Sequence, residues 1–187
     1  MSDMDDEPAR QVAELLRQRN AIDARIAEVI GRPVTAGHLG EWVAAQIFDI
    51  EMEASASAPG IDGRFRSGPL QGQSVNVKWY MKHQGLLDTS PSSALDHYLI
   101  LAGPPSQAGS SRGTTRPWCI ESVYLFAARQ LLAEQTARGV KPGIASSVTK
   151  RQWAAAQIYP VAGSPVLPLT TRQIAMLSPF LPISNHS

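Results

Sequence analysis

Three residues in the first half of the chain carry the groups that phosphodiester hydrolysis uses. Asp62 follows the turn-forming triplet Pro59-Gly60-Ile61, and Asn76 and Lys78 stand two positions apart in an apolar run. Cutting a phosphodiester requires an activated water, neutralisation of the charge that builds on phosphorus, and help for the leaving oxygen. A divalent cation held by carboxylates supplies these, and a lysine can assist. The alternative interpretation is a turn followed by an ordinary strand.

The ligand chemistry of Mg²⁺ indicates how these residues would divide the work. Mg²⁺ prefers hard oxygen ligands and keeps several waters, so one or two carboxylates and a backbone carbonyl suffice to hold it. Asp62 is the first candidate ligand, and the main-chain carbonyl of Val77 is the second, because a strand presents its carbonyls at the sheet edge. Lys78 would orient or activate the attacking water and stabilise the phosphate.

The segment SVNVKWYM, residues 74–81, must position two of these side chains. Its alternation predicts a strand with Asn76, Lys78 and Tyr80 on one face and Val75, Val77, Trp79 and Met81 on the other. RFRSGPLQGQ before it reads as a hairpin or turn-rich connection, residues 97–103 as a buried strand, and RPWCIESVYLF as the beginning of another strand.

Helical patterns surround these strands. Apolar spacing predicts an amphipathic helix from Pro8 to Ile30, which either docks on the domain or dimerises; Arg19 interrupts its seam. A second helix, capped by Thr35, is expected to run to about Phe48. Three more helices are expected near the C-terminus: residues 123–138, residues 149–159 capped by Thr149, and a segment after the Thr170–Gln173 capping box.

This order of elements predicts an α+β or three-layer αβα domain. We expect residues 1–33 to form an acidic tail and amphipathic helix, and residues 34–187 to form the core domain.

In the order of its acidic and basic residues, the chain resembles the PD-(D/E)XK nuclease superfamily. Pro59-Gly60-Ile61-Asp62 matches the first acidic element, Asn76-Val77-Lys78 matches the second, and GHLGEWVAAQIF offers Glu41 where many members place an additional acidic ligand. The resemblance covers about residues 35–102. It implies a restriction endonuclease-like fold, with a mixed sheet flanked by helices, and a Mg²⁺- or Mn²⁺-dependent endodeoxyribonuclease of restriction, defence or repair type.

The resemblance also implies site roles, with one departure from the family pattern. Glu41 and Asp62 would hold the metal with the Val77 carbonyl, and Lys78 would be the catalytic amine. The family usually has Asp or Glu where this chain has Asn76, so Asn76 would be a weak or water-mediated ligand. Because some members with eroded motifs only bind nucleic acid, a binding module for nucleic acid or a protein partner is the alternative function.

The distribution of charge is compatible with a polyanionic partner. Residues 1–59 carry five Arg and no Lys against eleven acidic residues, whereas residues 60–187 carry twelve basic against five acidic residues. A basic body attracts DNA or RNA, although an acidic helix lying on a basic domain for solubility explains the same charges. The candidate backbone-binding residues are Arg64, Arg66, Lys82, Arg112 and Arg116, with Lys150 and Arg151 farther along.

Other features exclude several classes of function. No apolar run approaches the ~20 residues of a membrane helix, and no secretory signal is visible, so we expect a soluble cytoplasmic protein. The single cysteine, Cys119, excludes an internal disulfide and a multi-cysteine zinc site. Simpler interpretations also exist: Asp62 as a turn stabiliser, Lys78 on a solvated face, and Glu41 as an exposed helix residue paired with His38.

Overall fold

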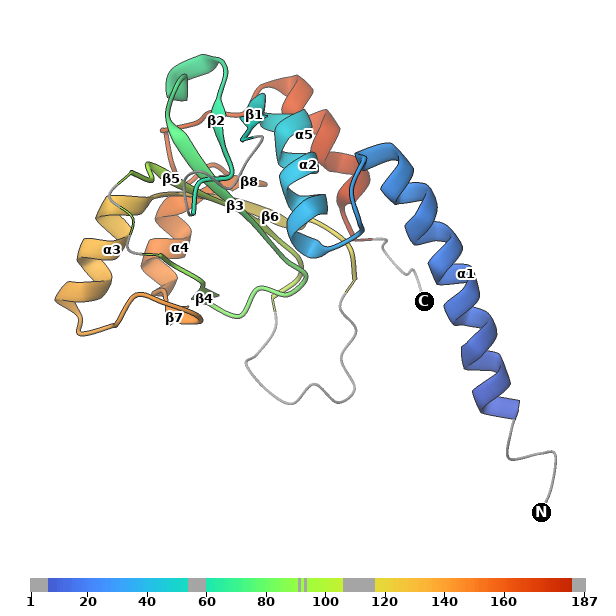
Figure 1. The fold of residues 1–187 in the computed structure, drawn as a ribbon. Coiled ribbons are helices and arrows are strands. Elements are labelled where there is room, and N and C mark those ends of the chain that lie inside the picture. The colour runs from blue at the N-terminus through green and yellow to red at the C-terminus, as the bar shows by residue number, and fades with distance from the viewer. Residues whose placement is uncertain (1–6, 54–59, 91, 93, 106–116, 183–187) are drawn as a thin grey trace.

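A mixed six-stranded sheet forms the centre of the molecule, with helices on both of its faces (Figure 1). The computed structural model describes residues 7–53, 60–90, 92, 94–105 and 117–182. The strands, in their spatial order across the sheet, are β1 (Ile50–Met52), β2 (Gly63–Phe65), β3 (Ser74–Tyr80), β5 (His97–Ala102), β6 (Ser122–Ala127) and β8 (Gln157–Tyr159).

The pairing pattern has one parallel step in an otherwise antiparallel sheet. β3 and β5 are parallel, with Val77 opposite Leu99, and every other neighbouring pair is antiparallel. The chain between β3 and β5 contains β4 (Leu86–Leu87), which pairs with β7 (Ser146–Ser147) in a separate two-stranded ribbon. The hydroxyl groups of Tyr80 and Tyr98 accept hydrogen bonds from this crossover, from the backbone N–H groups of Asp88 and Ser90 respectively.

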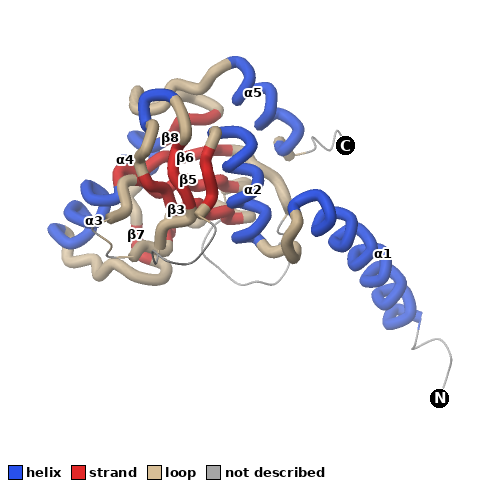
Figure 2. The backbone as a smooth tube through the Cα atoms, turned by 45° about the horizontal axis from the view of Figure 1, so that its top comes forward, coloured by secondary structure: helices blue, strands red, loops and turns tan. Residues whose placement is uncertain are grey.

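Helices on the two faces of the sheet give the domain three layers, as Figure 2 shows. α2 (Ala36–Phe48), α5 (Thr171–Leu177) and a short 3₁₀ turn, η2 (Ser178–Phe180), cover one face over Val75, Val77 and Trp79. α3 (Ala128–Ala137) and α4 (Lys150–Ala156) cover the other face over Tyr98, Ile100 and Tyr124. β5 is buried along its whole length, which is why its sequence HYLILA is apolar on both sides after His97.

Several local predictions are confirmed. The Thr35 hydroxyl accepts from the N–H of His38 at the start of α2, and Thr149 and Thr170 both form capping boxes, with Gln152 and Gln173. The first two helices have the predicted extents, and the hairpin before β3 contains β2 and a 3₁₀ turn, η1 (Gly68–Leu70). The alternation of β3 is also confirmed, because Val75, Val77 and Trp79 join one core cluster while Tyr80 packs on the other.

Two of the helix predictions near the C-terminus are wrong at one end. Residues 122–127 form strand β6, and the helix expected from residue 123 begins only at Ala128. The helix capped by Thr149 ends at Ala156, and Gln157–Tyr159 continue as strand β8 beside β6. In both places apolar β-branched and aromatic residues gain more by burial in the sheet than by continuing a helix.

The first helix, α1 (Glu7–Ile30), projects away from the domain, and Figures 1 and 2 show its N-terminal end far from the sheet. Ile30, its last residue, is its one buried residue. Among the described residues, no helix is both long and apolar enough to cross a membrane.

Candidate active site

Asp62 lies at the start of β2, where its backbone bridges two neighbouring strands. Its N–H donates to the carbonyl of Val75 at 2.9 Å, and its carbonyl accepts from the N–H of Glu53 at 2.9 Å. The residue after it must be glycine, because a Cβ on Gly63 would lie 2.5 Å from the Glu51 carbonyl oxygen and 2.7 Å from Ile50 Cγ2. This close approach of β1 and β2 holds the backbone of Asp62 in place.

The carboxylate of Asp62 terminates the pairing of β2 with β3. The described register ends at Gly63 opposite Val75, and the next inward-pointing N–H of β3, that of Val77, donates to Asp62 Oδ2 at 2.7 Å. The N–H and C=O of one strand residue point to the same side. The carbonyl of Val77 therefore points toward the same edge of β3 as its N–H.

Two further charged residues of the predicted site act on Asp62. Burial is the main cause of the raised pKa of Asp62, and the negative charge of Glu41 adds to it. The hydrogen bond from Val77 and the positive charges of Lys78 and Arg32 oppose this rise. Glu41 and Lys78 therefore both lie close enough to Asp62 to influence its carboxyl group electrostatically.

Close packing of α2 on β3 brings Glu41 to this edge. A Cβ on Gly40 would lie only 3.1 Å from Trp79 Cβ, so glycine lets the helix approach the strand at the residue next to Glu41. Glu41 is only 20% exposed and pairs with Arg32 at 2.5 Å. The predicted alternative, a Glu41–His38 pair, is not found, because His38 Nδ1 instead meets the carbonyl oxygen of Pro33 at 2.7 Å.

Asn76 lies on the same face of β3 as Lys78 and is buried, with only 8% of its surface exposed. Its side-chain oxygen, Oδ1, is fully enclosed and has no hydrogen-bond partner among the described residues. Such an orphaned acceptor is rare in folded proteins and requires an explanation. A bound cation, or a water held by one, would satisfy it.

These residues fit a hard divalent cation. The carboxylates of Glu41 and Asp62, the Val77 carbonyl and the unpartnered Asn76 oxygen are all oxygen ligands of the type that Mg²⁺ and Mn²⁺ take. In the part of the chain that the structure describes, no three His, Cys, Asp or Glu side chains gather as a metal-holding group.

The predicted DNA-backbone residues have mixed positions. Arg66 forms an ion pair with Asp49 at 3.0 Å. Asp49 is the C-cap of α2, so this arginine is paired at the end of that helix. Arg64 is exposed, donates to the Gly72 carbonyl and lies 3.7 Å from Glu53. Lys82 follows β3 and is partly exposed. Arg112 and Arg116 lie outside the described residues.

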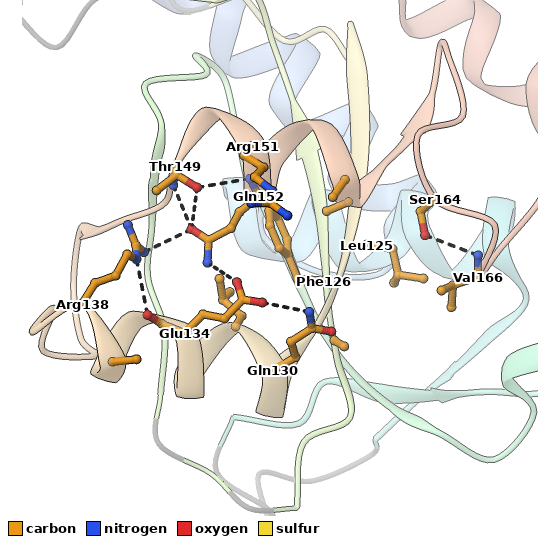
Figure 3. Close-up of a pocket in the computed structure, with 15 residues that line it drawn as sticks. Leu125, Phe126, Gln130, Glu134, Arg138, Thr149, Arg151, Gln152, Ser164 and Val166 are labelled. Atoms are coloured by element: carbon orange, nitrogen blue, oxygen red, sulfur yellow. Dashed lines mark hydrogen bonds between the residues drawn. The ribbon is translucent and has the colours of Figure 1, made fainter.

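A separate cavity of about 780 Å³ lies between α3 and α4; none of the predicted catalytic or metal-binding residues lines it, although Arg151 does (Figure 3). Its polar groups are paired with one another. The two carboxylate oxygens of Glu134 accept from Gln130 and Gln152, and Arg138 donates to Gln152. These bonds lower the pKa of Glu134 and fasten the two helices together.

Sequence reasoning missed Arg32. It stands in the turn between the first two helices, where no periodicity marks a side chain's direction. Its exposed guanidinium reaches Glu41 because the chain reverses at Gly31, which has a left-handed φ of 69°. The one sequence signal that could have pointed to Arg32 is its position in the turn-forming triplet Gly31-Arg32-Pro33.

No protein-family model matches the chain, and no curated protein matches it either.

Proposed function

We propose that this chain is a metal-dependent nuclease that hydrolyses phosphodiester bonds in DNA, with a restriction endonuclease-like fold. The observation that supports it most is the electrostatic interaction of Asp62 with both Glu41 and Lys78, together with the unpartnered side-chain oxygen of Asn76 on the strand that carries Lys78. Each residue alone has a simple structural explanation. A partly buried carboxyl group whose pKa is raised by burial, within the electrostatic influence of a second carboxylate and a lysine, is the kind of group that functional sites contain.

The order of elements supports the fold assignment. α2 carries Glu41, the hairpin strand β2 follows Asp62, β3 carries Asn76 and Lys78, and β5 lies parallel beside β3. This is the succession of acidic helix, Asp at a strand start, lysine-bearing strand and next core strand on which the resemblance to the PD-(D/E)XK superfamily rests.

The residues would divide the reaction as follows. Glu41, Asp62 and the Val77 carbonyl would hold Mg²⁺ or Mn²⁺, with Asn76 as a weak or water-mediated ligand. The bound cation would supply charge neutralisation and a more acidic water. Lys78, on the same strand face as Asn76, would orient the attacking water and donate hydrogen bonds to the phosphate. The Val77 N–H would keep the Asp62 carboxylate oriented throughout.

A second candidate function is binding of nucleic acid without cleavage. It is favoured by the ion pair of Arg32 with Glu41, which occupies one carboxylate, and by the neutral side chain at Asn76. In this case the same surface would bind the phosphate backbone through positive charge alone, with an affinity that falls as salt rises.

The test of the first function is cleavage of duplex DNA by the purified full chain with Mg²⁺ or Mn²⁺. Lys78→Met should lower cleavage at least about 100-fold, the usual contribution of a general acid–base or charge-stabilising group. Lys141→Met is the matched control, because Lys141 is exposed in the loop after α3. Metal-independent, salt-sensitive DNA binding without cleavage would favour the second function, and cleavage that survives in Lys78→Met would refute the proposed role of Lys78.

A further inference from the structure

The apolar stripe of α1 lies almost entirely in water. Val12 and Leu15 are 55% and 56% exposed, and Ile22 and Val29 are 56% and 69% exposed. Helices in proteins are stabilised mainly by packing of such a face, because an isolated helix is marginal in water. The stripe therefore lacks the contact that would bury it within one copy of the chain.

A wide groove runs between this stripe and the domain. It has a volume of about 1,210 Å³, and its apolar lining includes Ile22, Ile26 and Val29 of α1 and, facing them, Trp42, Trp118 and Phe180. This volume exceeds the ~300–1,000 Å³ typical of small-molecule pockets. Its length along α1 and its apolar walls suit a helix from another chain.

We propose that the occupant is α1 of a second copy of this chain, lying antiparallel to the first α1 in the groove. This proposal does not depend on the nuclease function. The stripe has the alternating three- and four-residue spacing of a coiled-coil seam. Its members are Val12, Leu15, Arg19, Ile22, Ile26 and Val29.

The antiparallel arrangement follows from the symmetry of this seam. A two-fold axis between residues 20 and 21 sets Val12 against Val29 of the other copy and Leu15 against its Ile26. A two-fold interface must be self-complementary in this way, because the same surface meets itself. Both pairs are apolar on apolar, so the seam of one copy matches the reversed seam of the other.

Charge explains the one polar position in the seam. The same axis sets Arg19 against Ile22 of the second copy and within one residue of its Asp23. In the single chain Arg19 and Asp23 are 3.6 Å apart and both remain exposed. In the pair, the stem of Arg19 would cover the opposing isoleucine while its guanidinium reached the opposing carboxylate. A polar residue at one seam position is a known device for fixing register.

The net charge of α1 also permits self-association. The helix carries four acidic residues and four arginines, so two copies do not repel each other. The acidic members are Glu7, Glu14, Asp23 and Glu28, and the basic ones are Arg10, Arg17, Arg19 and Arg25.

The first experiment measures the mass of the full chain in solution by light scattering after gel filtration. We expect twice the 20.2 kDa of one chain for the wild type, and 20.2 kDa for Ile22→Glu, which places a charge in the seam. Ala24→Glu adds the same charge on the exposed opposite face of α1 and should leave the dimer intact. A monomeric wild type, with or without a foreign protein bound, overturns the proposal, as does a dimer that Ile22→Glu leaves intact.

The second experiment tests the orientation. The variants Leu15→Cys and Ile26→Cys, each with one cysteine added to the buried Cys119, are treated with a short thiol crosslinker, separately and after mixing. A link as short as a disulfide forms only where the Cα atoms of the two cysteines lie within ~7 Å of each other. Antiparallel helices should give a crosslinked dimer only in the mixture. Crosslinking of each variant with itself indicates parallel helices and overturns the arrangement, and so does the absence of crosslinking in the mixture.

Discussion

The carboxylate of Asp62 accepts a hydrogen bond of 2.7 Å from the backbone N–H of Val77. The side chain of Asp62 thus takes the place of a strand partner for β3, just before β2 begins at Gly63. The same carboxyl group is influenced by the charges of Glu41 and Lys78. Asp62 therefore both completes the hydrogen bonding of β3 and is proposed to hold the cation. Different substitutions at Asp62 should affect stability and cleavage separately.

Asp62→Ala should lower the free energy of unfolding by about 1–3 kcal/mol, the cost of leaving a buried N–H without its partner. Asp62→Asn keeps an acceptor for the Val77 N–H and loses the buried charge, so its stability should stay within about 1 kcal/mol of the wild type. Both variants should lose metal-dependent cleavage. Urea unfolding and a DNA-cleavage assay on the two proteins check this, and an equal loss of stability in both would contradict it.

The raised pKa of Asp62 predicts a dependence of stability on pH. Since the folded pKa lies above the ordinary value of 3.8, the folded protein binds this proton more tightly than the unfolded chain does. The protonated Asp62 carboxyl group therefore stabilises the folded protein. This contribution is complete below pH 3.8 and is lost as the pH rises through the higher folded pKa.

The difference in unfolding free energy between wild type and Asp62→Asn isolates this effect from the other carboxyl groups. Over that pH window the wild type should lose stability relative to the variant. Denaturant titrations of both proteins at several pH values provide the measurement, and a constant difference would show that the pKa of Asp62 is not raised.

Asn76→Asp should tighten binding of Mn²⁺ by about tenfold or more, because ligand charge is a main determinant of affinity at such sites. Without metal, the new carboxylate would be buried at a position that is only 8% exposed, and the protein should become less stable by about 1–3 kcal/mol. Thermal unfolding with and without Mn²⁺ reads both effects. A variant that metal stabilises no more than the wild type would place the cation away from Asn76.

Arg32→Gln removes the cation that pairs with Glu41. The pair is partly exposed, with 47% of the Arg32 side chain accessible, so the cost in stability should be at most about 1 kcal/mol. Affinity for Mn²⁺ should rise by up to about fivefold, because Glu41 is released and a neighbouring positive charge is lost. Calorimetric titration measures this. Weaker binding of Mn²⁺ would indicate that Arg32 orients Glu41 rather than competing for it.

Gly40→Ala and Gly37→Ala test whether close packing of α2 positions Glu41. Both replace a helical glycine, which by itself should stabilise the protein by up to about 1 kcal/mol. A Cβ on Gly37 meets nothing closer than 3.9 Å, whereas one on Gly40 lies 3.1 Å from Trp79 Cβ. Gly37→Ala should therefore gain stability, and Gly40→Ala should gain none and lose Mn²⁺ affinity as Glu41 shifts. Equal stability and equal Mn²⁺ affinity in the two variants would show that close packing at Gly40 does not position Glu41.

Local sequence signals predicted much of the scaffold. Thr35 with its following apolar stripe defined α2, and strict alternation defined which side chains of β3 share a face. These features depend on residues within one or two turns of each other, so the sequence contains the whole interaction. The order of Glu41, Asp62 and Lys78 along the chain predicts a shared site by resemblance, and in the structure Glu41 and Lys78 both act electrostatically on Asp62.

Long-range contacts decided what local signals could not. Gln157–Tyr159 form a strand because they pair with β6, and the burial of Asn76 is not visible in the residues around it in the sequence. The pairing of Arg32 with Glu41 and the close contact of Gly40 with Trp79 join elements whose spacing in the sequence carries no periodicity. The sequence alone therefore determined which residues could do chemistry, because residue type and local spacing suffice for that. Only the tertiary structure decided their burial, their partners and hence their charge, because these depend on what packs around them.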